Sequence, residues 1–530
     1  MNRALYLIAF LFFVSSSAFS QTWERLFGVP YFIDSFRSLN TSYDEGYIVL
    51  IDRYYYPDTR GVIVKTDVNG NLLYELILGT GTGLSQGNYP SYIESTADGG
   101  MIICGSHDNF SPNDVGITKL DVCGNLEWCK TFRTDDNPDW GRVVHQLSDG
   151  GFVMLTQGYT DAGYKKIHLF RFDDIGNLLW IQPYALTENN PLLYPYGMTD
   201  LIVTANNDFF MTGSGYWASD SITGRLKAMT IIADSSREEK VISIYERDND
   251  NEYSDAYNSC QKGSGNIYVG ACDVDQNYHP MLLCMDTLGN FLYDTLIEFP
   301  LYNNRWADGY IVDPLFTSDD RMFVFTVYLD STLIFNSAPM GIHEIDSIGG
   351  WHNTFVLPTT HPYAKMVLTK DDKILFAGCF GYENDQQVIL SKFNTSLQYD
   401  SIYTVPRVYD YLCPDAIVSK TISLDCEVIV DVKDIPTPGE YYKSIKLIPI
   451  IPTPNPASDE IRFMLKNTEH HRNIRITCYD IFGREIDSTP VNSGMDEANM
   501  DISSWSGGMY MAVVYAGNTR VGSAKFIVSK

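Results

Sequence analysis

The sequence predicts an all-β chain, in which a seven-bladed β-propeller is followed by a small C-terminal β-sandwich of the Ig-like type. Two repeated patterns predict the propeller. The first is a polar turn followed by an apolar strand, and its seven copies begin at residues 44, 98, 149, 207, 265, 320 and 372, which are 51 to 58 residues apart. The second is a strand, a Gly-Asn turn and another strand. The repeats show no helical periodicity, so each is expected to hold four short strands.

The prediction of a propeller depends mainly on the repeated turns. Asp98-Gly99-Gly100 precedes an apolar run, and Asp149-Gly150-Gly151 does the same one repeat later. In the second pattern, Gly124-Asn125 separates two strand-like segments, and both residue types tolerate the positive φ that a tight hairpin turn requires. Because a single four-stranded sheet cannot bury both of its faces, the units are expected to stack radially. Two stacked β-sandwich domains are the alternative.

The ring has two candidate strands for its closing blade. Residues 22–28 resemble the outer strand that follows each Gly-Asn turn, and so do residues 396–405. The fourth and sixth repeats lack a clean Gly-Asn turn. The propeller is expected to span residues 21–405. Residues 406–448 are expected to cover its rim and then form a Pro-rich linker, and residues 449–530 to form the sandwich.

Residues 1–20 are predicted to be a secretion signal peptide. Arg3 supplies a positive charge, and the apolar run from residue 4 to 14 is shorter than the ~20 residues of a membrane span. Small residues before the expected cleavage site place the cut between Ser20 and Gln21. No later segment is long and apolar enough to cross a bilayer, so no transmembrane segment is expected in the mature chain.

The charge of the chain disfavours two classes of partner. With 66 acidic and 38 basic residues, the formal net charge is −28. Nucleic acid is not an expected partner, because phosphates require clustered Lys and Arg and the sequence contains no such cluster. Electrostatic docking on anionic lipid is disfavoured for the same reason.

The ten cysteines are all outside the predicted signal, and export would place them where disulfides form. A disulfide between Cys413 and Cys426 is the favoured pairing, since the two bracket a short segment after the repeats. Cys123 and Cys129 flank a Gly-Asn turn and are a second candidate pair.

Four motifs follow one another in the last eighty or so residues. They are Pro454-Asn455-Pro456, the turn from Asp480 to Gly483, the strand entry from Gly508 to Tyr510, and the closing strand from Lys525 to Lys530. In this order they resemble the type A C-terminal sorting domain of the type IX secretion system of certain Gram-negative bacteria. The resemblance implies that an outer-membrane export machine recognises the tail. It also implies that the protein passes through the periplasm to the cell surface. The repeats resemble the propeller repeats that often accompany such tails.

Aromatic residues are the main candidates for ligand binding. Those in the longer loops can stack on sugars or anchor a protein partner, and the alternative is that they fill blade interfaces. The candidates are Tyr54, Tyr55, Tyr56, Trp140, Tyr216, Trp217 and Trp306.

No cofactor is expected, although one acidic segment, which is interpreted first as a solvated loop, offers a possible calcium site. Asp248, Asp250 and Glu252 offer oxygen ligands at alternating positions, as calcium prefers, although the glycine of an EF-hand loop is missing.

The sequence contains no recognisable catalytic motif, which favours a non-enzymatic role and leaves catalysis open. The function expected is that of an exported, surface-attached propeller that binds glycan or protein. The alternatives are an extracellular polysaccharide hydrolase or lyase with acidic residues in its central funnel, and a surface scaffold protein.

Overall fold

The structure of the protein is a computed structural model, which divides into two units, Met1–Val432 and Lys433–Lys530. It describes residues 23–429 and 450–530 except for 30–31, 56–57, 80–87, 108–113, 133–139, 160–164, 185–192, 218–224, 235–238, 246–253, 264, 274–278, 298–308, 329–339, 347–348, 358–363, 382–385, 466–473, 481–483, 492–496 and 517–518. The predicted cleavage site at Ser20 and Gln21 therefore lies outside the described residues. Across the described ranges, no helix is long and apolar enough to cross a membrane.

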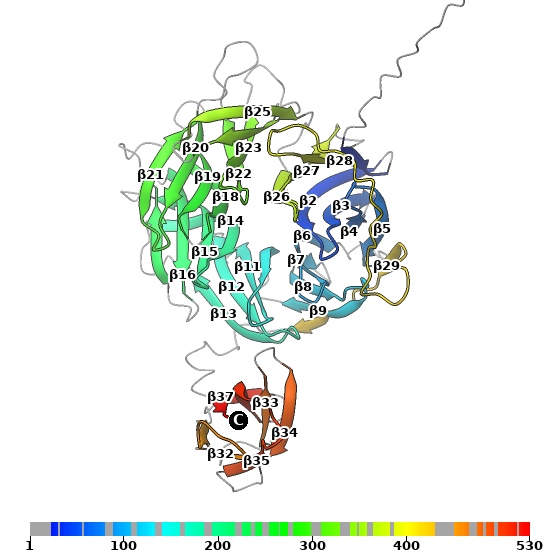
Figure 1. The fold of residues 1–530 in the computed structure, drawn as a ribbon. Coiled ribbons are helices and arrows are strands. Elements are labelled where there is room, and N and C mark those ends of the chain that lie inside the picture. Colours follow the sequence, from blue (N-terminus) through cyan, green and yellow to red (C-terminus); the bar gives the residue numbers. More distant parts are fainter. Residues whose placement is uncertain are drawn as a thin grey trace, which may run out of the picture. The chain divides into compact units, whose positions relative to one another are not determined.

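The first unit is a ring of seven antiparallel blades (Figure 1), which confirms the predicted seven-bladed propeller. Blade 1 contains β2 (Ile33–Thr41), β3 (Tyr47–Tyr55), β4 (Asp58–Thr66) and β5 (Leu72–Leu78). Blade 2 contains β6 (Asn88–Ser95), β7 (Met101–His107), β8 (Asp114–Leu120) and β9 (Leu126–Phe132). Blade 3 contains β10 (Trp140–Gln146), β11 (Phe152–Tyr159), β12 (Lys165–Phe172) and β13 (Leu178–Tyr184). Blade 4 contains β14 (Leu193–Val203), β15 (Phe209–Trp217), β16 (Arg225–Ala233) and β17 (Glu239–Ile244).

The remaining blades follow the same order from the axis outward. Blade 5 contains β18 (Ser254–Gln261), β19 (Ile267–Asp273), β20 (His279–Met285) and β21 (Phe291–Leu296). Blade 6 contains β22 (Gly309–Phe316), β23 (Met322–Tyr328), β24 (Met340–Ile345) and β25 (Trp351–Leu357). Blade 7 contains β26 (Ala364–Leu368), β27 (Ile374–Phe380), β28 (Gln387–Phe393) and, as its outer strand, β1 (Glu24–Phe27).

The ring is closed by the N-terminal candidate strand. β1 pairs antiparallel with β28, with Glu24 opposite Ser391. The other candidate, residues 396–405, does not form an outer strand, and only Tyr399 makes an isolated bridge with Phe393. Trp23, directly before β1, is fully buried in an apolar cluster that joins blades 7 and 1. The side chain of an aromatic residue therefore seals the seam at which the ring closes.

An ion pair with a buried cation links the first turn of most blades to their third strand. In blade 1, Lys65 Nζ lies 2.7 Å from Asp44 Oδ1, joining the third strand to the turn between the first two. Blades 2, 3 and 7 repeat this link with Lys119–Asp98, Arg171–Asp149 and Lys392–Asp371. At the corresponding position of blades 4 and 5 stand Ile232 and Cys284. The Gly-Asn turns adopt the expected positive φ, for example +67° at Gly124.

The segment after blade 7, residues 400–429, will be called the strap. It carries β29 (Lys420–Ile422), which pairs parallel with the outer edge of blade 1, and β30 (Glu427–Ile429), which pairs parallel with that of blade 2. The predicted Cys413–Cys426 disulfide is wrong. Cys413 pairs with Cys123 and Cys426 with Cys129, and both pairs join the strap to blade 2. The Cys123–Cys129 pairing is excluded too, because Cys129 lies opposite Thr118 in the hairpin.

The second unit is a sandwich of two sheets. One contains β31 (Ile450–Thr453), β32 (Glu460–Leu465) and β35 (Glu497–Asp501). The other contains β33 (Ile474–Tyr479), β34 (Glu485–Pro490), β36 (Gly508–Ala516) and β37 (Thr519–Val528). An aromatic core formed by Phe463, Trp505, Tyr510 and Phe526 lies between the sheets.

The motif residues of the tail meet around its last strand. Asn455, between Pro454 and Pro456, accepts a hydrogen bond from the Ile527 N–H at 2.9 Å. Lys530 Nζ donates to the Ser503 carbonyl at 2.9 Å. Asp480 caps its own turn by accepting from the Arg484 N–H at 3.0 Å, and Gly508 and Lys525 lie on the paired strands β36 and β37. Gly483 is outside the described residues. The first and last motifs, 72 residues apart, therefore form one structural unit.

Candidate functional site

The aromatic candidates that the structure describes share one end of the blades. Because the strands are antiparallel, the ends of β3 and β15 lie at the same end of the ring as the start of β10, opposite the tight turns. Tyr54, near the end of β3, is 37% exposed, and Trp140, the first residue of β10, is half-buried with the Arg142 guanidinium 5.0 Å from its ring. Tyr55, Tyr216 and Trp217 occupy strand ends at this same side.

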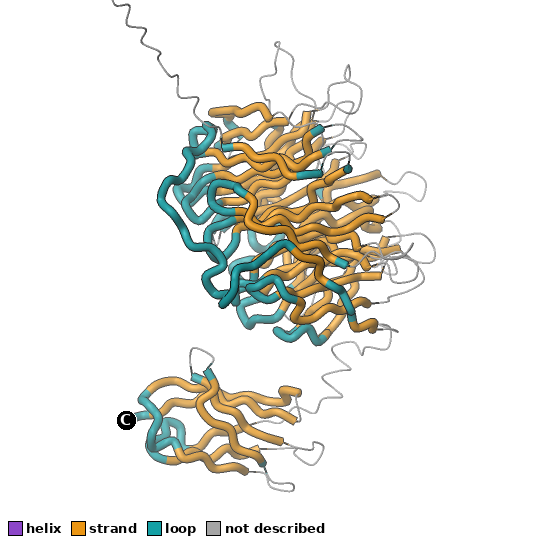
Figure 2. Tube along the Cα trace, turned by 90° about the vertical axis from the view of Figure 1, so that its right-hand side faces the viewer, coloured by secondary structure: helices purple, strands orange, loops and turns teal. Residues whose placement is uncertain are grey.

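Several predicted site residues cannot be placed. Tyr56, Trp306 and the calcium candidates Asp248, Asp250 and Glu252 lie outside the described residues. Among the residues that the structure describes, no group of three or more His, Cys, Asp or Glu side chains is arranged to hold a metal ion. The tight turns occupy the opposite end of the strands, where the described connections gather in Figure 2, and the strap runs from there along the outer edges of blades 1 and 2.

The innermost strands carry a second group of functional side chains that the sequence reasoning did not identify. In six of the seven blades, the register of the pairing between the innermost strand and the second strand shifts. The shift always lies five residues before the turn that joins these two strands. A bulge of this kind bends a strand and redirects the neighbouring side chains. The residues next to the slip include Tyr92, Asp200 and Asp313. Lys365 occupies the corresponding place on β26.

One contact shows that these side chains meet on the axis. Lys365 Nζ of blade 7 lies 4.2 Å from the centre of the Tyr92 ring of blade 2. Blade 1 stands between these two blades, so the contact joins inner strands that are not neighbours in the ring, around whose axis Figure 1 shows β26, β22, β18 and β14. The geometry is that of a cation over an aromatic face. Burial, together with the charges of Glu94, Asp200 and Asp313, raises the pKa of the Tyr92 hydroxyl well above its ordinary value.

His145 joins three blades at the axis. Its Nδ1 lies 2.5 Å from Glu94 Oε2 of blade 2, and its Nε2 lies 2.6 Å from the Leu201 carbonyl of blade 4. A carboxylate and a carbonyl both accept, so this geometry favours donation from both ring nitrogens of His145. Burial acts to lower the pKa of His145, but the Glu94 carboxylate outweighs it and raises that pKa. Burial likewise acts to raise the pKa of Glu94, and His145 holds it below its ordinary value.

The other two axial carboxylates also link blades. Asp200 accepts from the Ser259 N–H at 2.8 Å and from the Ser259 hydroxyl at 2.9 Å. Asp313 accepts from the Met366 N–H at 2.6 Å and from the Asn258 amide at 3.3 Å. Burial raises the pKa of Asp313 to about 6, against the opposing charge of Lys365. The cluster therefore holds one carboxyl that titrates near neutral pH, and its other acidic groups serve as ties between blades.

A sequence signal for these residues exists. Glu94 and His145 stand two residues before the first turn of their repeats, and Tyr92, Asp200, Asp313 and Lys365 stand four residues before it, so the side chains at these two positions mark the cluster. The turn motifs instead mark the start of the second strand, which is largely apolar.

Comparison with known proteins identifies the tail. Residues 453–529 match the family described as the secretion system C-terminal sorting domain. No curated protein matches the chain. Similar solved structures include a protein of unknown function from Dyadobacter fermentans, at 11% identity over 70% of this chain and 97% of that one, with a TM-score of 0.39. A GH93 α-L-arabinofuranosidase of Fusarium graminearum with arabinobiose is 9% identical over 69% and 97%, with a TM-score of 0.40. A polysaccharide lyase of family PL25, an ulvan lyase, is 8% identical over 71% and 97%, with a TM-score of 0.46.

Similarities this low carry no inference about ligand or activity. The match to the tail, in contrast, agrees with the order of its motifs and with the sandwich that they form. Residues 453–529 are a C-terminal sorting domain of the type IX secretion system, and the protein is secreted and attached to the cell surface.

Proposed function

We propose that the propeller is a non-catalytic binding module of the cell surface that takes a glycan ligand at the end of the blades opposite the tight turns. The observation that carries this proposal is the placement of aromatic residues from blades 1, 3 and 4 at one end of the ring, on β3, β10 and β15. Aromatic rings stack on the apolar faces of sugars and contribute strongly to binding. At the other end, the strap already contacts the first turn of blade 1 and the outer turn of blade 2.

The partners of the axial acidic residues also favour binding over catalysis. Glu94, Asp200 and Asp313 each accept hydrogen bonds from a neighbouring blade. Carboxyl groups bound in this way hold neighbouring blades together, and their oxygens already accept hydrogen bonds from the protein. A general acid or nucleophile must instead reach the substrate, and Asp313 is only 6% exposed.

An extracellular polysaccharide hydrolase or lyase is the second candidate, and one observation favours it. Asp313 has a pKa raised to about 6, and the carboxylates of Glu94 and Asp200 belong to the same cluster. Glycoside hydrolysis uses one protonated and one ionised carboxyl about 5–10 Å apart. This candidate requires that Asp313 becomes accessible to a sugar.

One experiment separates the two candidates. The secreted full-length protein is applied to an array of extracellular polysaccharides, and the products are analysed by mass. The proposal expects saturable binding without cleavage, weakened at least tenfold in Tyr216→Ala/Trp217→Ala and in Trp140→Ala. Trp351→Ala is the matched control, because Trp351 is an exposed aromatic on the outer strand β25 of blade 6. Repeating the binding with a chelator tests the calcium proposed at Asp248, Asp250 and Glu252.

The other outcomes are equally informative. Cleavage that is lost in Asp313→Asn would replace the binding module with the enzyme. Failure to bind any glycan would eliminate that ligand class and leave a protein ligand of the cell surface. Equal loss of binding in Trp351→Ala would show that the aromatic substitutions act through folding.

A further inference from the structure

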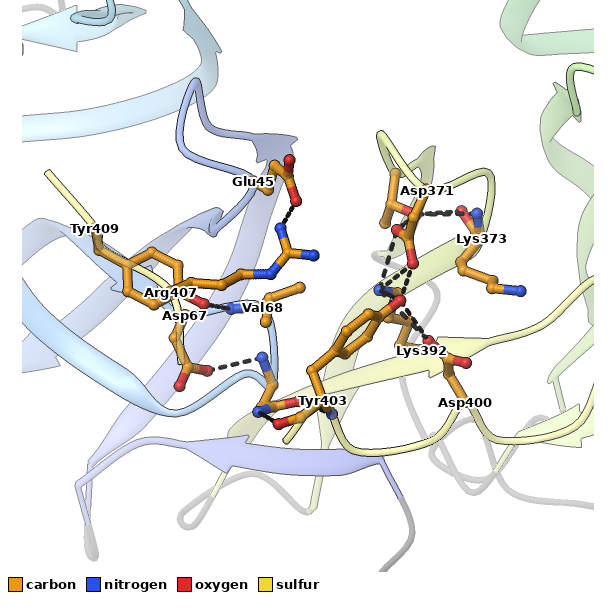
Figure 3. A network of polar contacts seen from close by, with 12 residues as sticks. Glu45, Asp67, Val68, Asp371, Lys373, Lys392, Asp400, Tyr403, Arg407 and Tyr409 are labelled. Atoms are coloured by element: carbon orange, nitrogen blue, oxygen red, sulfur yellow. Dashed lines mark hydrogen bonds and ion pairs between the residues drawn. The ribbon is translucent and has the colours of Figure 1, made fainter. Parts of the chain in front are cut away.

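The strap crosses the seam at which the ring closes. Figure 3 shows its first residues between blade 7 and blade 1. The backbone of Tyr403 donates to Asn69 Oδ1 at 2.8 Å and accepts from Asn69 Nδ2 at 2.9 Å. The Tyr409 hydroxyl accepts from the Val68 N–H at 2.9 Å, and Arg407 forms an ion pair with Glu45. Each of these contacts joins the strap to a turn of blade 1.

The strap also completes the environment of a buried cation in blade 7. Lys392 is fully buried, and its Nζ lies 3.0 Å from Asp371 of its own blade. Asp400 at 3.4 Å and the Tyr403 hydroxyl at 3.3 Å are the contributions of the strap, as the sticks in Figure 3 show. The Tyr403 hydroxyl donates to Asp371 as well. One end of the strap is therefore held by polar groups on both sides of the seam.

The far end of the strap is held by two short strands. β29 pairs with β5 over Lys420–Ile422, and β30 pairs with β9 over Glu427–Ile429. Both pairings are parallel, which is the less stable arrangement per residue, and each covers three residues at a sheet edge. Strands this short add few hydrogen bonds, so they depend on a further constraint.

The two disulfides supply that constraint. Cys129 and Cys426 directly precede the paired residues Lys130 and Glu427, and their Cα atoms are 4.5 Å apart, so this disulfide extends the register of the strand pair. Cys413 is joined to Cys123, in the outer turn of blade 2. The partners are 290 and 297 residues apart in sequence, with blades 3 to 7 between them.

We propose that the strap is a second closure of the propeller, and that oxidation locks it. With both disulfides formed, the strap is fixed on blades 1 and 2. With the four thiols reduced, β29 and β30 leave the blade edges while β1 keeps the ring closed. Because Cys413 and Cys426 reach blade 2 only when blade 7 stands beside blade 1, the disulfides form after the ring has closed.

The chemistry is thiol–disulfide exchange. For each lock, two cysteine thiols lose two protons and two electrons to an external disulfide, which becomes two thiols, and one S–S bond forms in the protein. Reduction by an external dithiol reverses the step. A compartment outside the cytoplasm supplies such disulfide oxidants.

The test is hydrogen–deuterium exchange of the full-length protein, measured by mass spectrometry before and after non-denaturing reduction with dithiothreitol. After reduction, the amides of residues 420–429 are expected to exchange at least tenfold faster, while those of β28 and β1 stay protected. Cys413→Ser/Cys426→Ser should behave in this way without reductant. Val418→Ala is the matched control, since Val418 is a largely exposed strap residue outside both strands, and it should leave exchange unchanged.

Three results would overturn the proposal. Unchanged protection of residues 420–429, once thiol counting shows complete reduction, would mean that non-covalent contacts hold the strap. Equal loss of protection in β28 and β1 would mean that the disulfides hold the whole propeller. Peptide mapping that joins Cys413 to Cys426 would contradict both disulfides between the strap and blade 2. If the double variant fails to fold, stepwise reduction of the wild-type chain and the single variant Cys426→Ser provide the same readout.

Discussion

Arg321 and Glu344 form an ion pair of 2.8 Å in blade 6 that links the first turn to the third strand, as the Lys65–Asp44 pair does in blade 1, but with the cation in the turn and the carboxylate on the strand. In blades 1, 2, 3 and 7 the cation stands on the third strand and the carboxylate in the first turn. Blades 1, 2, 3, 6 and 7 therefore each carry an ion pair between the first turn and the third strand, and either side can carry the positive charge.

The two pairs differ in burial, and this predicts different costs of breaking them. Lys65 and Asp44 are 1% and 0% exposed, whereas Arg321 is 31% exposed. Lys65→Met leaves a buried carboxylate unpaired and is expected to lower the free energy of unfolding by about 3–5 kcal/mol. Arg321→Met is expected to cost about 1 kcal/mol, because solvent screens the remaining charge. Thermal unfolding of the two variants checks the difference, and equal shifts would contradict it.

Asp313 is predicted to make the protein less stable as the pH rises from about 4 to 6. Its folded pKa is raised from 3.8 to about 6, so the folded state binds the proton more tightly across that range, and stability present below pH 3.8 is lost as the pH rises through 6. Asp313→Asn lacks this loss, and its stability relative to wild type is expected to rise by about 2 kcal/mol between pH 4 and 7.

The measurement for Asp313 is the melting temperature of variant and wild type across pH 4 to 7. Glu460→Gln, which removes an exposed carboxylate of the sorting domain, is the control and should leave the difference flat. A constant gap between Asp313→Asn and wild type at all pH values would contradict the raised pKa.

His145 is predicted to carry protons on both ring nitrogens at pH 7.5. The Glu94 carboxylate and the Leu201 carbonyl both accept, so loss of either proton would break a hydrogen bond between blades. Nitrogen-15 spectra of protein labelled on histidine report the protonation of each ring nitrogen, and His145→Gln assigns the signal. A neutral tautomer at that pH would show that the bridge is made differently.

Trp23 is predicted to be the dominant side chain of ring closure. It is fully buried and makes an edge contact with Tyr47, with the ring centres 5.9 Å apart. Trp23→Ala is expected to lower the free energy of unfolding by about 3–5 kcal/mol. Leu26→Ala on the same segment, at a side chain 49% exposed, is expected to change it by no more than about 0.5 kcal/mol. Denaturant unfolding of the two variants distinguishes closure by packing from closure by backbone pairing alone.

The blade count could be predicted from the sequence because the turn motifs that mark the blades are formed by residues close together in the chain. Asp98-Gly99-Gly100 and Gly124-Asn125 are turns whose geometry depends on residues a few positions apart. The identity of the closing strand could not be decided in this way. Residues 22–28 and 396–405 have similar patterns, and they are separated only by the pairing of β1 with β28 and by the burial of Trp23 against blade 1.

The disulfides show where local reasoning fails. Cys413 and Cys426 are close in sequence, yet each finds its partner on blade 2, because the strap runs along the edges of blades 1 and 2. The strap strands β29 and β30 are only three residues long, which is too short for the alternation of a β-strand to be recognised in the sequence. The axial cluster was missed for a related reason, since Glu94, His145 and Lys365 are ordinary polar residues until the ring brings separate blades together.

The pairing of Glu24 with Ser391 joins positions 367 residues apart in the chain. Until blade 7 exists, β1 has no strand edge to join, and Trp23 can pack only against blade 1. The propeller is therefore completed in one late step that needs almost its entire length, and any truncation before Phe393 leaves both the first strand and the first blade without their neighbours.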